Sequence, residues 1–416
     1  MTSIIPLLKG ESIKVYGPMS ITVRKGVVDV LGKIFEENSR IIVHKTKNFI
    51  IHAIEDSELD MTTTPESSVL PVDENDPYLR KYRLCQEIAG KLSGVVMLVG
   101  GTDSGKSSFA TLLSNHLIKA GREPAVLDAD VGQSNIGPPA FISIGKVREP
   151  VLWIGEVKPE AMRFIGDVKP HVNTWKIIYG SKELVNRYQP GGGRVVIVDT
   201  DGWVKDEKGL RYKLAFASTL KPDILIVFGG DIAPYFRRLE KLGISIFEFE
   251  VSPTRRVRSR DERRMLRSMS YREYLYNAPI VKLSLEDLVV IGLPLLEGVP
   301  VAVDKIEEYF EGKILYASIL SDKLYVAGFI RKINHEVLQQ KLGVNKVEVF
   351  EPGSERNIYS SVSNGDADYP AIIDKIDFKD MKIILKTRFD DKISEIRVSS
   401  IRLREDFTEE FLEGFY

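Results

Sequence analysis

Residues 100–107 carry the clearest chemical signature in the chain. They read Gly-Gly-Thr-Asp-Ser-Gly-Lys-Ser, which matches the phosphate-loop pattern G-x-x-x-x-G-K-S at every fixed position. An apolar run at 95–99 predicts a buried strand before the loop, and apolar residues at helical spacing predict a helix over 108–120. In this context the loop's backbone N–H groups bind a polyphosphate, Lys106 contacts its outer phosphates and Ser107 holds a Mg²⁺.

The sequence therefore predicts a nucleoside triphosphate site. The residues expected to contact the nucleotide are Gly100, Gly101, Thr102, Asp103, Ser104, Gly105, Lys106, Ser107 and Ser108.

Two carboxylates close the second predicted strand of this region, at 125–130. Side chains alternate along a strand, so Asp128 and Asp130 point the same way. A carboxylate near the phosphate loop could accept a proton from an incoming hydroxyl or hold Mg²⁺ through water. Asp130 is the better candidate because it lies closer to the strand end. The alternative, that a carboxylate only caps the following turn, applies more to Asp128.

A third predicted strand, at 195–199, is apolar and ends in Asp199. This is the usual form of the second motif in nucleoside-triphosphate-binding proteins, whose carboxylate lies near the metal, so Asp199 joins Ser107 as a candidate metal ligand. Thr200, Gly202 and Trp203 follow it closely. A tryptophan here either stacks on a nucleobase or packs in the core, and its position alone does not decide between the two.

Eight arginines lie between residues 255 and 272, and they form the densest positive patch in the chain. If 261–276 is helical, Arg263 and Arg267 lie one turn apart on one face, where they can contact phosphates or stabilise transition-state charge. The alternative is an ordinary solvated face. The use of arginine without lysine, directly after a predicted strand, favours a lid.

The elements that position these residues fall into three segments. Residues 1–75 show short β segments separated by glycine turns, 76–295 alternates strands with helices, and 296–416 returns to β-like segments. The pattern predicts an α/β protein: a central phosphate-loop NTPase domain with a parallel sheet, a β-rich N-terminal domain and a smaller β-rich or α+β C-terminal domain. Ligands gather at the carboxyl ends of parallel strands, so Gly105, Asp130 and Asp199 are expected in one site.

Composition restricts the class of protein. The chain has 416 residues with 43% hydrophobic and 28% charged, and its 58 Lys plus Arg against 59 Asp plus Glu give a net charge of −1. Every apolar run is shorter than the roughly 20 residues of a membrane span, and no secretory signal pattern begins the chain. The single cysteine, Cys85, excludes an internal disulfide framework. We therefore expect no membrane association and a cytoplasmic protein, or a nuclear one if the source is a eukaryote.

These motifs together resemble the polynucleotide 5′-hydroxyl kinase family, which includes archaeal RNA kinases and the kinase subunit of eukaryotic pre-mRNA cleavage factor. The resemblance rests on the loop at 100–107, the run from Asp128 to Gln133 (DADVGQ), the run from Thr200 to Trp203 and the arginine segment ending at Tyr274. It implies that ATP and Mg²⁺ bind at the loop and that Asp130 activates the 5′-hydroxyl. Trp203 would stack on a terminal base, with Gln133, Thr200 and Gly202 also on the substrate side, and Arg263 and Arg267 would form the lid.

The implied activity is ATP-dependent phosphorylation of the 5′-hydroxyl end of RNA, with DNA as a further candidate substrate, in RNA processing or repair alongside RNA-processing proteins. A rival from another class is a scaffold of an RNA-processing complex that holds ATP without turning it over. A regulatory GTPase is disfavoured, because no Asn/Thr-Lys-x-Asp motif follows the predicted strand at 224–228. No local pattern separates RNA from DNA as the substrate.

Overall fold

The computed structural model describes residues 2–45, 47–73, 76–251 and 258–412. The chain divides into two compact units. The first unit holds 1–130, 143–160 and 178–257, and the second holds 131–142, 161–177 and 258–416. The N-terminal segment thus shares a unit with most of the phosphate-loop region. The C-terminal segment shares the second unit with residues 131–142 and 161–177. The three-domain division at 75 and 295 stays a prediction.

The N-terminal segment forms β structure, as predicted from its short segments and glycine turns. Its strands are β1 (Thr2–Leu7), β2 (Ser12–Tyr16), β3 (Met19–Lys25), β4 (Val28–Val30), β5 (Lys33–Phe35), β6 (Arg40–Val43), β7 (Asn48–Ala53), β8 (Ser57–Thr63) and β9 (Ser68–Pro71). They pair in the orders β1-β8-β3-β6 and β5-β4-β7-β2-β9. In β3, buried Ile21 and Val23 alternate with partly exposed Ser20 and Thr22, so each sheet can bury one face.

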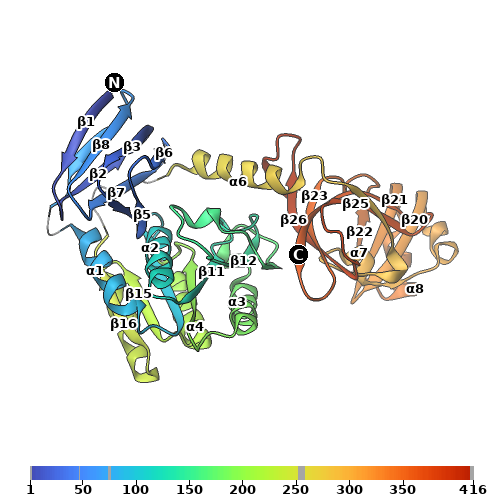
Figure 1. The fold of residues 1–416 in the computed structure, drawn as a ribbon. Helices are drawn as coiled ribbons and strands as arrows, with labels where there is room; N and C mark the ends of the chain where they lie inside the picture. The colour runs from blue at the N-terminus through green and yellow to red at the C-terminus, as the bar shows by residue number, and fades with distance from the viewer. Residues whose placement is uncertain (1, 46, 74–75, 252–257, 413–416) are drawn as a thin grey trace. The chain divides into compact units, whose positions relative to one another are not determined.

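A mixed sheet forms the centre of the first unit (Figure 1). Within this unit the strand order is β12-β11-β14-β10-β15-β16. The strands are β10 (Gly94–Gly100), β11 (Glu123–Ala129), β12 (Phe141–Lys146), β14 (Arg194–Thr200), β15 (Ile224–Phe228) and β16 (Ser245–Phe249). The expected parallel sheet is confirmed for β11, β14, β10, β15 and β16. Strand β12, which the sequence analysis did not predict, runs antiparallel to β11. The parallel strands are apolar nearly throughout because both of their faces are buried.

Helices precede and follow these strands along the chain. They are α1 (Pro77–Ala89), α2 (Lys106–Lys119), α3 (Thr174–Tyr188), α4 (Glu207–Leu220) and α5 (Ala233–Phe236). The helix expected over 108–120 is therefore present and begins at Lys106 itself. Helix α2 packs on β10, β11 and β14, and α1 packs on α2. This arrangement seats the start of α2 at the carboxyl end of β10.

A buried aspartate links the N-terminal strands to helices α1 and α2. Asp29 of β4 is fully buried, and one of its carboxylate oxygens accepts hydrogen bonds from the Tyr82 hydroxyl of α1 at 3.1 Å and the Lys119 ammonium of α2 at 2.8 Å. The Asn115 amide of α2 also donates to the Leu31 carbonyl at 2.7 Å. The helix that carries Lys106 is therefore anchored to the N-terminal β structure by polar contacts.

The second unit contains the C-terminal sheets. Its strands are β13 (Ala161–Phe164), β17 (Ile280–Ser284), β18 (Val289–Ile291), β19 (Val299–Pro300), β20 (Phe310–Leu320), β21 (Lys323–Ile333), β22 (Lys346–Phe350), β23 (Ile358–Ser363), β24 (Asp368–Asp377), β25 (Lys382–Thr387), β26 (Glu395–Leu403) and β27 (Glu409–Phe411). One sheet has the order β17-β25-β24-β23-β26-β18, with β27 on β26, and another the order β19-β20-β21-β22. Strands β17 and β18 precede residue 296, so this sheet draws on chain upstream of the boundary expected there.

The helices of the second unit are α6 (Arg260–Leu275), α7 (Pro294–Glu297) and α8 (His335–Leu342). The arginine-rich helix expected at 261–276 is thus present as α6. Its buried residues Tyr271 and Leu275 lie in a cluster with Phe141, Phe164 and Tyr359. The C-terminal sheets and α6 therefore share a core with segments that follow β11 and β12 in the sequence.

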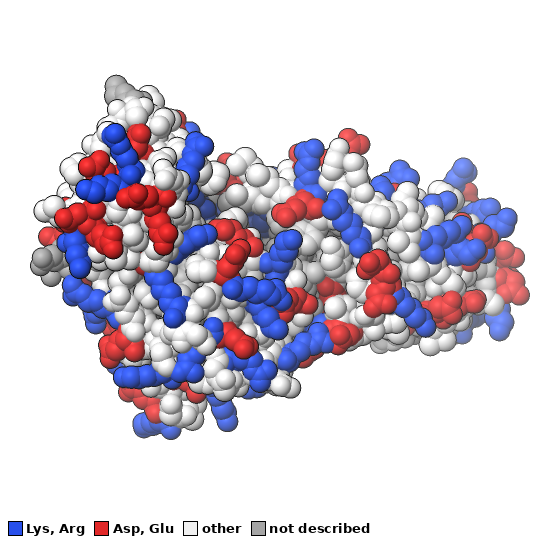
Figure 2. All heavy atoms as spheres, viewed as in Figure 1, with Lys and Arg blue, Asp and Glu red and all other residues white. Residues whose placement is uncertain are grey.

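The surface carries charges of both signs. On the face drawn in Figure 2, Lys and Arg are interspersed with Asp and Glu in each part of the chain, in keeping with the net charge of −1. Among the helices that the structure describes, none combines the length and the apolar character needed to cross a bilayer.

Replacing Asp29 tests the anchor between the N-terminal strands and α1 and α2. We expect Asp29→Ala to lower the free energy of unfolding by roughly 1.5–3 kcal/mol, the range for hydrogen bonds to a charged group. The measurement is urea unfolding followed by circular dichroism. Asp29→Asn, which keeps a carbonyl acceptor, should lose less. Equal and negligible losses in both variants would contradict the anchoring role.

Candidate active site

The phosphate loop connects β10 to α2 in the predicted way. Gly105 is the residue before α2 and has φ +97°, a conformation in which side chains other than glycine's are strained. Gly100 is restricted by space, because a Cβ there would lie 2.6 Å from the Cβ of Phe228. Since Gly105 has no side chain to cap α2, the first N–H groups of the helix face the loop, as an anion site requires.

Lys106 turns back onto its own loop. Its ammonium donates to the carbonyl oxygens of Gly100 and Gly101, each at 2.9 Å, and the residue is buried. The charge is therefore held within the loop by two carbonyl dipoles. A bound polyphosphate would compete with these oxygens for the ammonium group.

Ser107 and Asp199 meet at the start of α2. The serine hydroxyl donates to Oδ2 of Asp199 at 2.6 Å. Burial raises the pKa of Asp199 to about 6, and the charge of Lys106 and the bond from Ser107 oppose that rise. Oδ1 of Asp199 is also buried and accepts no hydrogen bond from any residue that the structure describes.

The Ser107 hydroxyl oxygen and Oδ1 of Asp199 fit a Mg²⁺ ion. Within the described residues no group of three or more Asp, Glu, His or Cys side chains could hold a metal. Mg²⁺ commonly uses only one or two protein oxygens and completes its shell with water and substrate phosphates. The buried acceptor of Asp199 and the Ser107 hydroxyl, next to a phosphate loop, are oxygens of the kind that such a site uses.

Asp128 and Asp130 occupy different environments at the end of β11. Asp128 is buried, and its carboxylate accepts the backbone N–H of Asp130 at 3.0 Å, the contact expected of a residue that shapes the turn. Asp130 is half-buried, and its charge contributes to the raised pKa of Asp199. Because β11 and β14 are adjacent and parallel, with Asp128 opposite Asp199, the ends of both strands reach the same edge of the sheet as the phosphate loop.

The loop after β14 packs closely on the phosphate loop. A Cβ on Gly202 would lie 2.5 Å from the backbone nitrogen of Thr102, so only glycine allows this approach. Thr200 is buried and its hydroxyl donates to the Leu98 carbonyl of β10 at 2.8 Å. Trp203 is half-buried, and its indole N–H donates to Asp206 at 2.9 Å. The tryptophan is thus outside the main core, and stacking on a base stays a prediction.

A buried ion pair that the sequence analysis missed supports this loop. The Lys213 ammonium of α4 lies 2.6 Å from Oδ2 of Asp201, and both side chains are almost fully buried. The Tyr212 hydroxyl donates to the same oxygen at 3.1 Å, and Oδ1 of Asp201 accepts the backbone N–H of Trp203 at 2.9 Å. Burial lowers the pKa of Lys213, and the charge of Asp201 opposes that change.

The sequence contained one signal for this pair. Lys213 falls on the apolar stripe of α4, in the i, i+3, i+4, i+7 register of the buried residues Phe216, Ala217 and Leu220. A lysine in such a stripe needs a buried partner. The pattern does not identify that partner.

The predicted lid residues belong to the second unit, together with Gln133. Nε and Nη2 of Arg267 form a bidentate ion pair with Glu409 of β27 at 2.7 and 2.8 Å, and Nη1 donates to the Gly132 carbonyl at 3.4 Å. The Tyr271 hydroxyl donates to the same carboxylate at 2.9 Å. Arg263 lies one turn before Arg267 on α6 and is half-buried. Glu409, which no motif marked, therefore fixes Arg267 in this structure, and the lid role of both arginines stays a prediction.

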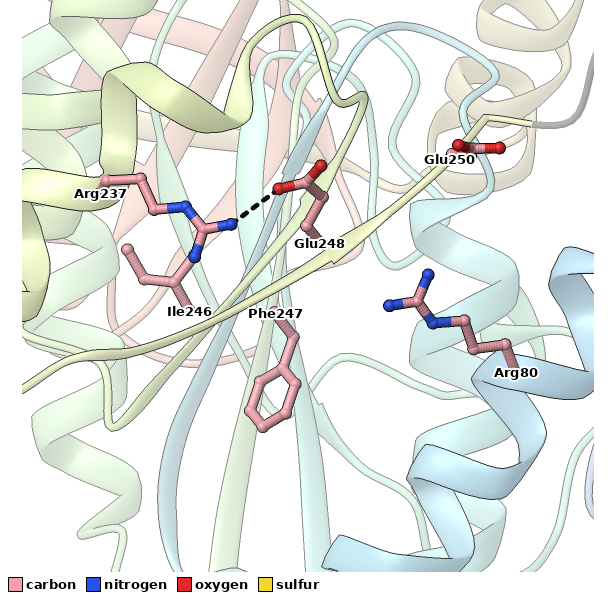
Figure 3. Close-up of a pocket in the computed structure, with 6 residues that line it drawn as sticks. All are labelled: Arg80, Arg237, Ile246, Phe247, Glu248 and Glu250. Carbon is pink, nitrogen blue, oxygen red and sulfur yellow. Dashed lines mark hydrogen bonds and ion pairs between the residues drawn. The ribbon is translucent and has the colours of Figure 1, made fainter.

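A pocket of about 370 Å³ lies at the outer strand of the first unit's sheet (Figure 3). It is lined by Arg80, Arg237, Ile246, Phe247, Glu248 and Glu250. Arg237 and Glu248 form an ion pair at 3.0 Å, and Arg80 points toward the pocket from α1. None of the predicted site residues lines this pocket.

Comparisons with known proteins place the chain among similar sequences. Residues 100–277 match a family model described as the P-loop of mRNA cleavage and polyadenylation factor CLP1. A polyribonucleotide 5′-hydroxyl-kinase of Pyrococcus furiosus is 29% identical over 339 residues, which cover 79% of this chain and 93% of the relative. One of Methanocaldococcus jannaschii is 28% identical over 75% of this chain and 87% of its own length.

The fold is shared with a protein of known structure. A Clp1p structure, determined in complex with residues 454–563 of Pcf11p, has a TM-score of 0.63 over 97% of this chain and 98% of its own, at 15% identity. Residues 100–277 thus match the CLP1 P-loop family model, and the chain has a Clp1-like fold. The resemblance inferred from the motifs and the predicted fold class are both confirmed.

The Asp201–Lys213 pair gives a test of the support beneath Trp203. Removing one partner of a buried pair leaves an uncompensated charge, so we expect Lys213→Met to lower the free energy of unfolding by roughly 3–5 kcal/mol. The double variant Asp201→Asn/Lys213→Met should be more stable than Lys213→Met alone, as measured by urea unfolding. The single variant Asp201→Asn completes the cycle. If the double variant loses as much free energy of unfolding as the two single variants together, or more, the two side chains do not stabilise each other directly.

Proposed function

We propose that this chain is an ATP-dependent polynucleotide 5′-hydroxyl kinase that transfers the γ-phosphoryl group to the 5′-hydroxyl end of RNA. The observation that carries the proposal is the meeting of the phosphate loop, the Ser107–Asp199 pair and Asp130 at one edge of the sheet. The archaeal relatives named polyribonucleotide 5′-hydroxyl-kinases support it. DNA with a 5′-hydroxyl end is a further candidate substrate, and the cytoplasm is the proposed compartment.

In the proposed reaction Asp130 accepts the proton of the 5′-hydroxyl as its oxygen attacks the γ-phosphorus. The bond from the γ-phosphorus to the bridging oxygen breaks, and ADP leaves with that electron pair. A positioned general base of this kind contributes roughly 10²–10⁴-fold in rate. Asp130 suits the role because its side chain is half-buried at the strand end, whereas Asp128 is buried and accepts the backbone N–H of Asp130.

The remaining site residues would neutralise the negative charge of the phosphates. Ser107 and Asp199 would hold Mg²⁺, which supplies neutralisation of the phosphate oxygens when bound. Lys106 leaves the Gly100 and Gly101 carbonyls to contact the outer phosphates. Arg263 and Arg267 serve as the lid that stabilises charge on the transferring group. To offer Nε and Nη2 to a phosphate, Arg267 must first leave Glu409.

Substrate contacts are proposed for the loop after β14 and the turn after β11. Trp203 stacks on the terminal base, and Gln133, Thr200 and Gly202 are the other proposed substrate contacts. Since the Thr200 side chain is buried against β10, its contribution comes from its backbone and from shaping the loop. A role beside RNA-processing protein partners is proposed by analogy with Clp1p, which was solved with Pcf11p.

A nucleotide-holding scaffold is the second candidate. The presence of Lys106, Asp130 and both Arg263 and Arg267 favours turnover over this alternative. The scaffold and the kinase differ in turnover, which the first experiment below measures.

The deciding experiment incubates the protein with γ-labelled ATP, Mg²⁺ and an oligoribonucleotide with a 5′-hydroxyl end. We expect label on the RNA, and at least a hundredfold less with Lys106→Ala, since that lysine contacts the transferred phosphate. A matched oligodeoxyribonucleotide measures the DNA preference. Bound ATP with no labelled product from the wild-type protein would favour the scaffold.

Asp130→Asn separates the catalytic carboxylate from its neighbour. The variant keeps the side chain's shape but removes its basicity, so we expect normal binding of ATP and oligonucleotide with a loss of roughly 10²–10⁴-fold in kcat. Asp128→Asn is the matched control, because its amide oxygen can still accept the Asp130 N–H, and it should lose little. Large and equal losses of Mg²⁺·ATP affinity in both variants would instead make the two aspartates joint metal-site residues.

The two arginines of α6 should behave differently. We expect Arg263→Ala to lower kcat more than it raises the KM for ATP, because a lid acts most strongly as charge develops. Arg267→Ala should lower kcat and also the Tm, since it leaves the buried Glu409 carboxylate without its bidentate partner. Steady-state kinetics and thermal unfolding measure both. If kcat is unchanged in each variant and only salt-sensitive RNA binding falls, α6 is a docking surface.

A further inference from the structure

Lys81 of α1 lies directly beside the phosphate loop. Its ammonium nitrogen is 3.8 Å from the position that a Cβ on Gly105 would occupy. Gly105 immediately precedes Lys106 in the loop, whereas Lys81 lies 25 residues before Lys106 in the chain. Lys81 also precedes residues 100–277, the stretch that matches the CLP1 P-loop family. No sequence motif marks this lysine.

Two aromatic rings hold the ammonium group at the carboxyl edge of the sheet. The nitrogen is 5.2 Å from the ring centre of Phe228, the last residue of β15, and 5.8 Å from that of Phe249, the last residue of β16. Strand β15 is the neighbour of β10, which leads into the phosphate loop. The rings orient the cation at the edge where ligands of parallel sheets bind.

The charged surroundings of Lys81 do not neutralise it. None of the ion pairs formed among the described residues includes this lysine, which is half-buried. The groups that act on it are Asp76 before α1, Lys14 of β2 and Cys85 of the same helix. Burial lowers the pKa of Lys81 to about 8; Asp76 opposes this change and Lys14 adds to it. A bound anion at this point would raise the pKa of Lys81 and stabilise its charged form.

We propose that Lys81 is a second nucleotide-binding lysine, which contacts the α- or β-phosphate of the bound nucleoside triphosphate from the side of α1. Lys106 then serves the outer phosphates and Lys81 the inner ones, next to Gly105. This inference rests on the proposed nucleotide site and adds a residue to it from outside the phosphate-loop motif. Helix α1 also carries Tyr82, which binds Asp29 of β4, so the nucleotide would contact the element that joins the sheet to the N-terminal strands.

The test measures nucleotide binding directly by calorimetry, with the full-length protein, Mg²⁺ and either ATP or ADP. Losing a charge-assisted contact should weaken binding of Lys81→Ala by roughly 10- to 100-fold. The loss should be the same for ATP and ADP, because the contact is to an inner phosphate. A normal Tm without nucleotide shows that the variant is folded.

Arg80→Ala is the matched control. Arg80 is the neighbouring cation on α1 and lies over the ring of Phe249 at 5.8 Å, but it lines the pocket at the sheet edge and is exposed. We expect its ATP affinity to stay within about threefold of wild type, a difference below 1 kcal/mol. Wild-type affinity in Lys81→Ala, or an equal loss in Arg80→Ala, would overturn the proposal. A loss for ATP alone would also overturn it, since it would move the contact to the γ-phosphate.

Lys81→Arg supplies a second test. In the wild-type protein, ATP affinity should fall as the pH rises from 7 to about 9.5, because the lysine with a pKa of about 8 loses its charge over that range. Arginine stays charged, so the variant should lose most of that pH dependence. The same slope in both proteins would contradict the role. A wild-type protein that shows this binding behaviour without phosphorylating RNA would refute the kinase function and leave the Lys81 contact standing.

Discussion

The balance of charge at the carboxyl edge of the central sheet is the constraint on which the rest of the site depends. Asp130, Asp199 and Asp201 lie there with Lys106 and Lys213, and most of these side chains are buried. Burial disfavours every charged form, so each carboxylate needs a cation or a donor. Lys213 satisfies Asp201, while Ser107 and Lys106 act on Asp199. If Lys106 moves to a phosphate, Asp199 loses a compensating charge just where a metal ion could replace it.

The surrounding fold holds this edge in place through a few polar contacts with long sequence separations. Asp29 connects the N-terminal strands to α1 and α2, and α2 begins at Lys106. The close approach of Gly202 to Thr102 couples the loop after β14 to the phosphate loop. The N-terminal β structure, the phosphate loop and the tryptophan loop therefore form one connected assembly, and a change at Asp29 or Asp201 acts on the site without touching a ligand.

In the second unit, α6 is bound to β27 through Glu409. Arg267 and Tyr271 share the carboxylate of Glu409, and Tyr271 packs with Tyr359 and Phe141 in the core. A bidentate arginine pair is geometrically specific, so it orients α6 as well as stabilising it. The same guanidinium cannot bind a phosphate with its full fork while both oxygens of Glu409 occupy it. Any lid function of Arg267 thus depends on how readily this pair opens.

The sequence alone was enough to predict the phosphate loop, the strand ends at Asp130 and Asp199, the helix that carries Arg263 and Arg267, and the α/β class. These features follow from spacing over a few residues: a glycine pattern, an apolar run, a helical period. Other features came only from the folded chain: Lys213 neutralises Asp201, Glu409 binds Arg267, Lys81 lies beside Gly105 and β12 runs antiparallel to β11. Glu409 lies 142 residues from Arg267. Partners this far apart leave no periodic trace in the chain, because the packing of whole elements brings them together.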